Sequence, residues 1–408
     1  MTRIIILNDF AYVNGGASQV ALSSALGLAQ AGYDVTLFTA VHPIDSTLLN
    51  QAGLQVFCTG QHEILNDPNR WRASANGWWN QLAAQKFEAL LKEFDPTDTV
   101  VHLHGWTKAL SSSAVRVAVK HNFPLVCSLH DYFTACPNGA FFNYPQGSIC
   151  RLKPLSSACW LSHCDARSYP QKLWRATRGV IQQSFGGLPT KIQTFITVSE
   201  LSQSLLRPYL PEDARIFRVD NPIDVTQTQP VDVAQNDKFL VVGRISEEKG
   251  GLLLDEFDGS QLVFVGDGPL RERIQTILPA AEITGWLPHP QVIEQLRKAR
   301  AVIFPSLLYE TQGLAVLEAA AMGIPAIVPD TCAAREWVED GETGLWFRGG
   351  DKKDLWKKSR LLTDPNLAKK LGQAAFARYW EAPCTMERHI RGLADVYGHM
   401  VKSEDASA

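Results

Sequence analysis

Short apolar runs rich in β-branched residues alternate with stretches of helical periodicity along the whole chain. Several of these runs are apolar at consecutive positions, as is typical of strands that a parallel sheet buries on both faces. The runs in the first half are Ile4–Leu7, Val35–Phe38, Leu54–Phe57, Thr99–Leu103, Leu125–Leu129, Phe195–Val198 and Arg215–Arg218. After the first run, apolar or small residues recur with a helical period from Ala17 to Leu28, before Gly32. This alternation predicts an α/β fold built on doubly wound parallel sheets.

A polar segment with two prolines, residues 222–237, interrupts the alternation and predicts a linker. We therefore expect an N-terminal domain over residues 1–221, a second α/β domain over 238–369 and a helical tail over 370–408. The tail either caps the second sheet or crosses back to the first domain. The predicted strands of the second domain are Phe239–Val242, Leu262–Val265, Ile283–Thr284, Ala301–Phe304, Ala326–Val328 and Leu345–Phe347.

Composition is ordinary for a globular protein of two or three domains: 408 residues, 45% hydrophobic, 20% charged and a net charge of −3. This charge gives no reason to expect a nucleic-acid partner. No apolar run reaches the roughly 18 residues that a membrane-spanning helix needs, and the apolar run near the N-terminus is too short for a signal peptide. We therefore expect a cytoplasmic protein, in keeping with eight irregularly spaced cysteines.

The segment Tyr309–Pro325 places two carboxylates, Glu310 and Glu318, eight residues apart. Gly313 and Gly323 mark the limits of a predicted helix, so that Glu310 lies in the loop before it and Glu318 lies inside it. The free amides of the first helical turn form a natural anion site. This layout fits a ligand with a sugar, a diphosphate and a ribose, which describes a nucleotide-sugar. Spacing alone leaves open a pair of solvated glutamates.

Further candidate residues follow predicted strands, where open α/β sheets bind their ligands. Gly15 and Gly16 form a turn after the first strand that admits close backbone approach to a phosphate or sugar, or that is simply a tight turn. Arg244 and Lys249 follow the first strand of the second domain and match phosphate oxygens, although surface cations often serve only solubility. His130, which closes another strand, either meets a sugar hydroxyl or is buried against backbone.

Together these motifs resemble the retaining glycosyltransferases of GT-B fold in the "glycosyl transferases group 1" family, the glycogen-synthase and sucrose-synthase-like group. The resemblance covers nearly the whole chain, and the order and spacing of the motifs carry it. They are Gly15–Ala17, Ser128–Asp131, Thr197–Glu200, Asp220–Asp224, Gly243–Gly250, Val265–Pro269 and Tyr309–Pro325. The resemblance implies two Rossmann-like domains with a cleft between them. It also implies transfer of a sugar, with retention, from a nucleotide-diphosphate-sugar to a hydroxyl of a glycan or lipid-linked glycan.

The resemblance assigns catalytic roles to four side chains. Arg244 and Lys249 are expected to hold the donor diphosphate and to neutralise the leaving group. Glu310 is expected to contact the hydroxyls of the donor sugar, and His130 to lie near its C6 side. No protein nucleophile is then needed, because the departing phosphate oxygen deprotonates the acceptor hydroxyl.

Eight more positions are expected to bind the donor. Glu318 should take the ribose hydroxyls, and the backbone near Trp286 and Leu287 should hold the base. The positions are Gly15, Gly16, Gln312, Gly313, Leu314, Glu318, Trp286 and Leu287. Gln312 stands where many relatives have a small or aromatic residue, which leaves the identity of the sugar open, and Pro222 predicts a stiffer hinge.

No D-x-D pair suited to a metal-bound diphosphate is present, so we predict no obligatory metal or other cofactor. An irregular insert is predicted at residues 132–190. Its four cysteines leave two alternatives open, a structural zinc site and reduced thiols, because their spacing lacks the usual C-x2-C knuckle. They are Cys136, Cys150, Cys159 and Cys164.

The same insert carries six cations against one acid, Asp165, together with several aromatic residues. This composition suits an anionic acceptor or a peripheral membrane contact, and a solvated basic face is the alternative. The cations are Arg151, Lys153, Arg167, Lys172, Arg175 and Arg178. For the whole protein, a nucleotide-sugar epimerase and a non-catalytic nucleotide-sugar-binding or scaffold protein remain alternatives. The base, sugar, acceptor, linkage and oligomeric state stay open.

Overall fold

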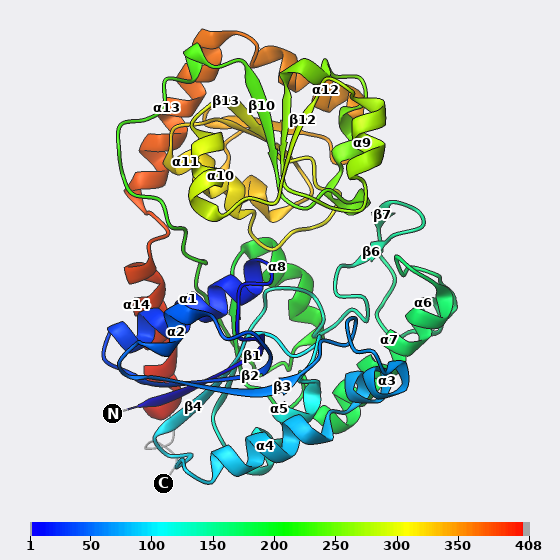
Figure 1. Cartoon of the computed structure of the whole chain (residues 1–408), viewed down its shortest axis with the longest axis vertical. Helices are drawn as coiled ribbons and strands as arrows, with labels where there is room; N and C mark the ends of the chain where they lie inside the picture. Colours follow the sequence, from blue (N-terminus) through cyan, green and yellow to red (C-terminus); the bar gives the residue numbers. More distant parts are fainter. Residues whose placement is uncertain (1, 403–408) are drawn as a thin grey trace.

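A computed structural model describes residues 2–402, and it has two lobes, each built on a parallel sheet (Figure 1). The first sheet has seven strands in the order β3-β2-β1-β4-β5-β8-β9. Its order changes direction between β1 and β4, which pair with each other. The strands are β1 (Arg3–Phe10), β2 (Asp34–Val41), β3 (Leu54–Gln61), β4 (Thr99–Leu103), β5 (Leu125–Ser128), β8 (Thr194–Thr197) and β9 (Arg215–Arg218).

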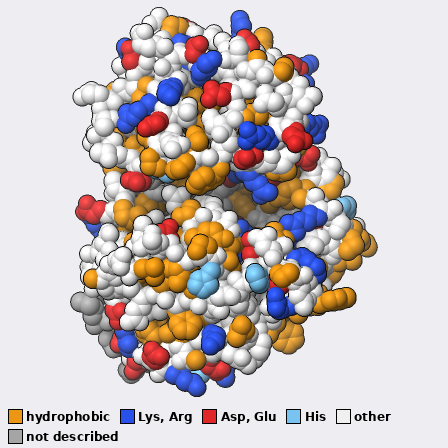
Figure 2. All heavy atoms as spheres, viewed as in Figure 1, with side chains coloured by type: hydrophobic (Ala, Val, Ile, Leu, Met, Phe, Trp, Pro, Cys, Tyr) orange, Lys and Arg blue, Asp and Glu red, His pale blue; other side chains and the backbone are white. Residues whose placement is uncertain are grey.

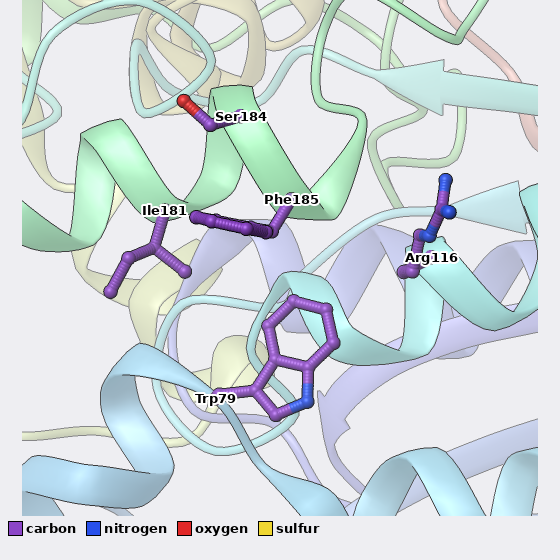
Figure 3. A pocket seen from close by; sticks show the side chains of 5 residues that line it. All are labelled: Trp79, Arg116, Ile181, Ser184 and Phe185. Atoms are coloured by element: carbon purple, nitrogen blue, oxygen red, sulfur yellow. The ribbon is translucent and has the colours of Figure 1, made fainter.

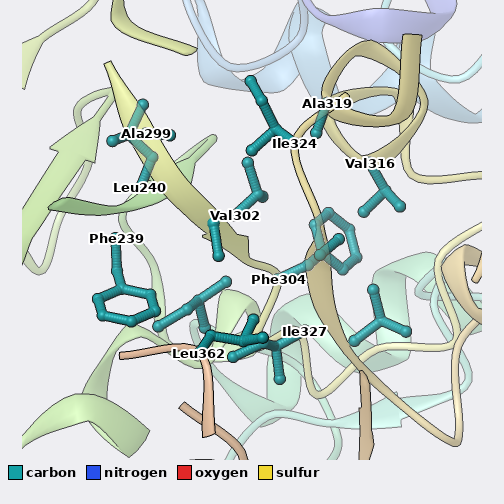
Figure 4. Close-up of a cluster of buried hydrophobic side chains, with 14 of the residues drawn as sticks. Phe239, Leu240, Ala299, Val302, Phe304, Val316, Ala319, Ile324, Ile327 and Leu362 are labelled. Carbon is teal, nitrogen blue, oxygen red and sulfur yellow. The ribbon is translucent and has the colours of Figure 1, made fainter. Parts of the chain in front are cut away.

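The second sheet has six strands in the order β12-β11-β10-β13-β14-β15, and its order changes direction between β10 and β13. Buried side chains of β10, β13, β14 and α11 lie together in the core of this lobe (Figure 4). The strands are β10 (Lys238–Val242), β11 (Leu262–Val265), β12 (Glu282–Gly285), β13 (Ala299–Ile303), β14 (Ala326–Pro329) and β15 (Gly344–Phe347).

Helices connect the strands in both lobes, as parallel pairing requires. Those of the first lobe are α1 (Gly16–Gln30), α2 (Ser46–Leu49), α3 (Arg70–Trp78), α4 (Gln81–Leu91), α5 (Ser112–Lys120) and α8 (Glu200–Leu206). Those of the second lobe are α9 (Arg271–Ile277), α10 (His289–Leu296), α11 (Leu314–Ala321), α12 (Lys352–Leu361) and α13 (Pro365–Glu381).

All thirteen strands predicted from the apolar runs are present, and the α/β fold with two doubly wound sheets is confirmed. The expectation that residues 132–190 are irregular is wrong in part. Between the short strands β6 (Phe142–Asn143) and β7 (Ser148–Ile149) and the end of the insert lie α6 (Ser157–Leu161) and α7 (Tyr169–Ile181). Helix α7 was missed because several of its buried contacts involve polar side chains, which obscure the apolar period.

The chain crosses back to the first lobe at its end (Figure 1). Helix α13 packs on α11, and α14 (Met386–Lys402) packs on α1 and the first sheet. A Cβ on Gly27 of α1 would lie 2.9 Å from the side chain of Ile390, so α14 packs closely on α1 at this glycine. The buried hydroxyl of Tyr397 hydrogen-bonds His102 Nδ1 at 2.7 Å. Residues 403–408 of the predicted tail lie outside the described residues.

We predict that Leu393→Ala destabilises the first lobe, because Leu393 of α14 is fully buried against the first sheet. The free energy of unfolding, measured with urea, should fall by about 3 kcal/mol through lost burial and a residual cavity. Arg391→Ala removes a side chain of the same helix that is 68% exposed, and it should change stability by less than about 0.5 kcal/mol. Equal effects of the two substitutions would contradict the packing role of α14.

Candidate active site between the two sheets

A hollow crosses the middle of the molecule between the two lobes (Figure 2). In each sheet the strand order reverses at one position, between β1 and β4 and between β10 and β13. Such switch points at the carboxyl ends of strands are where α/β sheets bind ligands. In the first lobe Gly15 follows β1 and His104 follows β4. In the second lobe Arg244 follows β10, and Glu310 follows β13. The fold therefore gathers most of the candidate residues on two facing edges.

The glycine turn after β1 meets the second lobe directly. Gly15 has φ +98°, which favours glycine, and it precedes the first residue of α1. A Cβ built on Gly16 would lie 3.9 Å from Leu314 Cδ1, so the turn and the start of α11 are in van der Waals range. Gly16 and Leu314, both expected to bind the donor, thus come from opposite lobes and lie side by side.

The carboxylate of Glu310 is the most tightly held acid of the cleft. Its Oε1 accepts hydrogen bonds from Lys249 Nζ and Ser306 Oγ, each at 2.6 Å. The backbone of Glu310 has φ +42°, an uncommon left-handed conformation for a residue with a side chain. Its carbonyl accepts a hydrogen bond from Tyr132 Oη of the first lobe at 3.3 Å. Lys249 and Glu310, expected to meet different parts of a donor, are thus brought together.

Arg244 follows β10 and is a cation without an ion pair among the described residues. Its side chain is exposed. The turn that presents it is closely packed, because Gly243 has φ +138° and a Cβ on Gly266 would lie 2.0 Å from the Gly243 carbonyl oxygen. The hairpin of the insert reaches this turn. Burial raises the pKa of Tyr144 to about 12, and the charge of Glu248 adds to that rise.

Three backbone amides at the start of α11 are available to an anion. Those of Gln312, Gly313 and Leu314 donate no hydrogen bond among the described residues. Gly313 caps the helix with φ +89°, and a Cβ there would lie 2.8 Å from Ala334 Cβ, so both conformation and space require glycine. An unpaired helical first turn carries partial positive charge, which suits a phosphate.

The side chain of Gln312, one of the expected donor-binding positions, contacts the first lobe. It is buried, and its Oε1 accepts a hydrogen bond from the Asn221 amide at 3.1 Å. The physical reason is that the amide of Asn221, at the end of the first lobe, needs a partner once it is buried. The side chain therefore joins the two lobes, and only backbone of this residue faces the anion site.

Glu318 is buried inside α11 and hydrogen-bonds His289 of α10. Its Oε1 lies 2.9 Å from His289 Nε2. This hydrogen bond raises the pKa of His289 above its ordinary value of 6.5, against the opposing effect of burial. Nearby, Trp286 is 75% exposed, whereas Leu287 packs into the second core. The structure thus places the imidazole of His289 at the carboxylate that is expected to take a ribose.

His130 belongs to a group of stacked histidines. Its Nε2 lies 2.9 Å from His104 Nδ1, and its carbonyl accepts a hydrogen bond from Thr311 Oγ1 at 3.1 Å. Burial, together with the smaller effect of the nearby His389, lowers the pKa of His130 to about 4. The ring is therefore neutral near pH 7 and can donate or accept one hydrogen bond. His104 Nε2 is buried without a partner among the described residues.

The zinc alternative is not supported by the arrangement of the insert. No group of three or more His, Cys, Asp or Glu side chains suited to a metal is formed within residues 2–402. Cys136 Sγ lies 3.1 Å from Asn138 Oδ1, and Cys159 Sγ lies 3.2 Å from the buried Lys172 Nζ. The thiols are all free, and those of Cys136, Cys159 and Cys164 contact neighbouring polar side chains.

The basic face expected from the insert is smaller than its composition indicates. Lys172 is fully buried, and Arg175 pairs with Asp165 at 3.1 Å. Arg178 donates to the Thr107 carbonyl. The exposed cations of the insert are Arg151, Lys153 and Arg167.

Sequence reasoning missed four side chains of the cleft. Ser306 holds Glu310, His289 holds Glu318, and Tyr132 holds the backbone of Glu310. Ser306 and Tyr132 do follow predicted strands, which was a usable signal. His289 and Glu336, a carboxylate that contacts the first lobe, lack such a signal because only tertiary folding brings them to their partners.

Two Rossmann-like lobes with cations and open amides at facing sheet edges define a two-domain enzyme of GT-B type. The sequence profile of "Glycosyltransferase Family 4" matches residues 14–227, more than half of the chain, and that of "Glycosyl transferases group 1" matches residues 227–378. The chain therefore belongs to the group 1 glycosyltransferase family.

The chain is similar to known proteins over more than half of its length. The chain is 25% identical to a glycogen synthase of Mycobacterium tuberculosis, over 90% of this chain and 87% of that protein. It is 29% identical to the putative glycosyltransferase EpsD of Bacillus subtilis, over 53% and 54%. In fold it is similar to a sucrose-phosphate synthase of Thermosynechococcus elongatus, with a TM-score of 0.71, 17% identity and coverage of 99% and 100%. Anabaena HepE in complex with UDP-glucose gives a TM-score of 0.65 at 17% identity, with coverage of 98% and 100%.

We predict a pH-dependent contribution of His289 to stability. Because the pKa of His289 is raised in the folded state, its ion pair with Glu318 stabilises the protein fully below pH 6.5. The contribution should vanish as the pH rises through the raised pKa. The difference in melting temperature between the wild type and His289→Gln should therefore be larger at about pH 5.5 than at about pH 9. His62→Gln, at an exposed histidine, should show no such trend.

Proposed function

We propose that the protein transfers a sugar from a nucleotide-diphosphate-sugar to a hydroxyl of a glycan or lipid-linked glycan, with retention of anomeric configuration. The proposal is carried by three features that follow strands of the second sheet: the unpaired Arg244, three unpaired amides at the start of α11, and the Lys249–Glu310 pair. This arrangement supplies positive charge where a diphosphate would leave and a carboxylate where sugar hydroxyls would lie. Anabaena HepE, of the same fold, has been crystallised with UDP-glucose.

Charge stabilisation is the proposed source of the rate. As the bond between the sugar C1 and the phosphate oxygen breaks, negative charge grows on the diphosphate, where Arg244, Lys249 and the amides are aimed. One such preorganised donor can lower a barrier by about 3 kcal/mol. Side-chain cations and amides together can fill the role that a metal fills elsewhere, so we propose that no metal is obligatory.

Retention follows if the acceptor attacks from the face that the leaving group vacates. The acceptor oxygen bonds to C1, and its proton passes to the departing phosphate oxygen. Glu310 is then a hydroxyl-binding residue, because its Oε1 is already bound by Lys249 and Ser306. The epimerase and scaffold alternatives are not favoured, since the family profile and the relatives are those of glycosyltransferases.

We further propose a lipid-linked acceptor and a peripheral contact with the inner face of a membrane. The first lobe exposes Trp71, Leu161 and Phe185, with exposed fractions of 88%, 79% and 65%. Phe185 also lines a cavity of about 470 Å³ with Trp79 and Ile181, and Arg116 lies at its side (Figure 3). Exposed aromatics beside cations are typical of interfacial anchors. Among residues 2–402, no helix is both long and apolar enough to cross a membrane.

The donor proposal predicts a ligand-induced stabilisation that depends on Lys249. Melting temperatures measured with UDP-, GDP-, ADP- and dTDP-sugars should rise for one nucleotide, since a ligand at about 100 times its Kd adds roughly 2.7 kcal/mol. The rise should be lost in Lys249→Ala and kept in Lys298→Ala, which removes an exposed lysine of the same lobe. No rise with any of these donors would contradict the proposal.

Once the donor is identified, its hydrolysis, in which water takes the place of the acceptor hydroxyl, provides a test of the mechanism. Proton NMR of the first sugar released should show the anomeric configuration of the donor. Arg244→Ala should lower the rate by about 10²- to 10³-fold, as the loss of one transition-state donor does elsewhere. An inverted product, or an unchanged rate in Arg244→Ala, would show that the mechanism is wrong.

The membrane proposal predicts binding to vesicles of phosphatidylglycerol through the apolar face. Phe185→Ser should weaken the binding about tenfold, because a buried phenyl ring is worth about 1.5 to 3 kcal/mol. Trp356→Ser alters an aromatic residue of the second lobe that is 42% exposed, and it should have no effect. Co-sedimentation measures both. Equal binding of the two variants would contradict a contact through this face.

A further inference from the structure

A single carboxylate of the second lobe is bound to the backbone of the first. Glu336 lies in the 3-10 helix Ala333–Trp337, and its side chain is 15% exposed. Its Oε2 accepts a hydrogen bond from the Glu200 amide at 3.0 Å, and its Oε1 accepts one from the Leu201 amide at 2.8 Å. These amides open α8, so they have no partner within that helix. Both oxygens of Glu336 are therefore used across the boundary between the lobes.

A cation of the first lobe completes the contact. Arg218 Nη1, at the end of β9, lies 3.3 Å from Glu336 Oε2, and Arg218 Nε also bonds Asp220 at 3.0 Å. Charge-assisted hydrogen bonds of this kind are about twice as strong as neutral ones. The contact differs from an ordinary surface ion pair because two rigid backbone amides fix its geometry. We call Glu336 with its partners Glu200, Leu201 and Arg218 the interlobe clamp.

The same 3-10 helix also supports the loop 309–314, which carries Glu310 and the open amides. The Ala333 amide donates to the Tyr309 carbonyl at 2.9 Å. Ala334 lies directly under Gly313, where a Cβ would come within 2.8 Å. A displacement of Glu336 is therefore transmitted to the loop through two contacts of the same short helix.

Three side-chain hydrogen bonds join the loop 309–314 to the first lobe. Tyr132 Oη donates to the Glu310 carbonyl, Thr311 Oγ1 donates to the His130 carbonyl, and the Gln312 side chain bonds Asn221. The left-handed conformation of Glu310 is unfavourable for a residue with a side chain, so it persists only where neighbours hold it. The shape of the loop thus depends on contacts that exist only when the lobes lie together.

We infer that Glu336 is a positioning residue, whose interlobe clamp holds the loop 309–314 in its reactive shape when the lobes close. The inference rests on the proposed sugar transfer, to which it adds a requirement for closure. The side chains expected to bind a nucleotide diphosphate, Arg244, Lys249 and Glu318, all belong to the second lobe, so this binding should depend little on the clamp. Turnover needs His130 and Gly15 of the first lobe beside the loop, and so does need it.

The test is Glu336→Ala compared with Glu342→Ala, a nearby exposed glutamate with no side-chain partner among the described residues. Glu336→Ala should lower kcat/KM for the nucleotide-sugar by about tenfold or more, since lost charge-assisted hydrogen bonds are worth at least one factor of ten. The Kd for the free nucleotide diphosphate, measured by calorimetry, should stay within about twofold of the wild type. Glu336→Gln, which keeps one amide acceptor, should fall between them.

Scattering from the protein in solution distinguishes a contact that holds the two lobes together from one that only supports the loop 309–314 locally. Glu336→Ala should have a larger radius of gyration than Glu342→Ala in solution, with and without donor, and an unchanged melting temperature of the second lobe. An equal radius of gyration, or a loss of nucleotide affinity that matches the loss of kcat/KM, would overturn the inference. If the wild type turned over no nucleotide-sugar, the proposed function would fail, while the scattering comparison would still decide whether Glu336 holds the lobes together.

Discussion

The structure depends on the backbone of the loop 309–314 being held from both lobes. Within the second lobe Lys249 and Ser306 bind the Glu310 carboxylate, and from the first lobe Tyr132 binds its carbonyl. Glu310 and Gly313, three positions apart, both have left-handed backbone, and the amides of Gln312, Gly313 and Leu314 donate no hydrogen bond among the described residues. The site is thus built mainly from backbone, and its electrostatics come from unmade hydrogen bonds as much as from charged side chains.

Burial decides which of the ionisable groups of the cleft carry charge. Desolvation lowers the pKa of His130 to about 4 and raises that of Asp131 to about 6, although the two residues are adjacent in sequence. His289, which has Glu318 as a partner, shifts in the opposite direction from His130. The first lobe therefore offers the neutral imidazole of His130 to the cleft, and the second lobe supplies the cations Arg244 and Lys249.

The insert shows how charge composition misleads when tertiary packing is unknown. Lys172 bonds a thiol in the interior and Arg175 pairs with Asp165, so these cations contribute nothing to a basic surface. The cysteines, which by number suggested zinc, instead bond side chains such as Asn138. Beside the three exposed cations Arg151, Lys153 and Arg167, the insert exposes apolar side chains at Leu161 and, just beyond α7, at Phe185.

The sequence by itself determined the fold and the local turns, because strand burial, helix limits and glycine conformations are set by neighbouring residues. The runs that became β1 to β5 and the Gly313 cap were predicted for this reason. Tertiary structure alone decided the partners: Gln312 turns to Asn221, and Glu318 meets His289. Those contacts join residues 91 and 29 positions apart, and no local pattern encodes a hydrogen bond made after two lobes or two helices have packed.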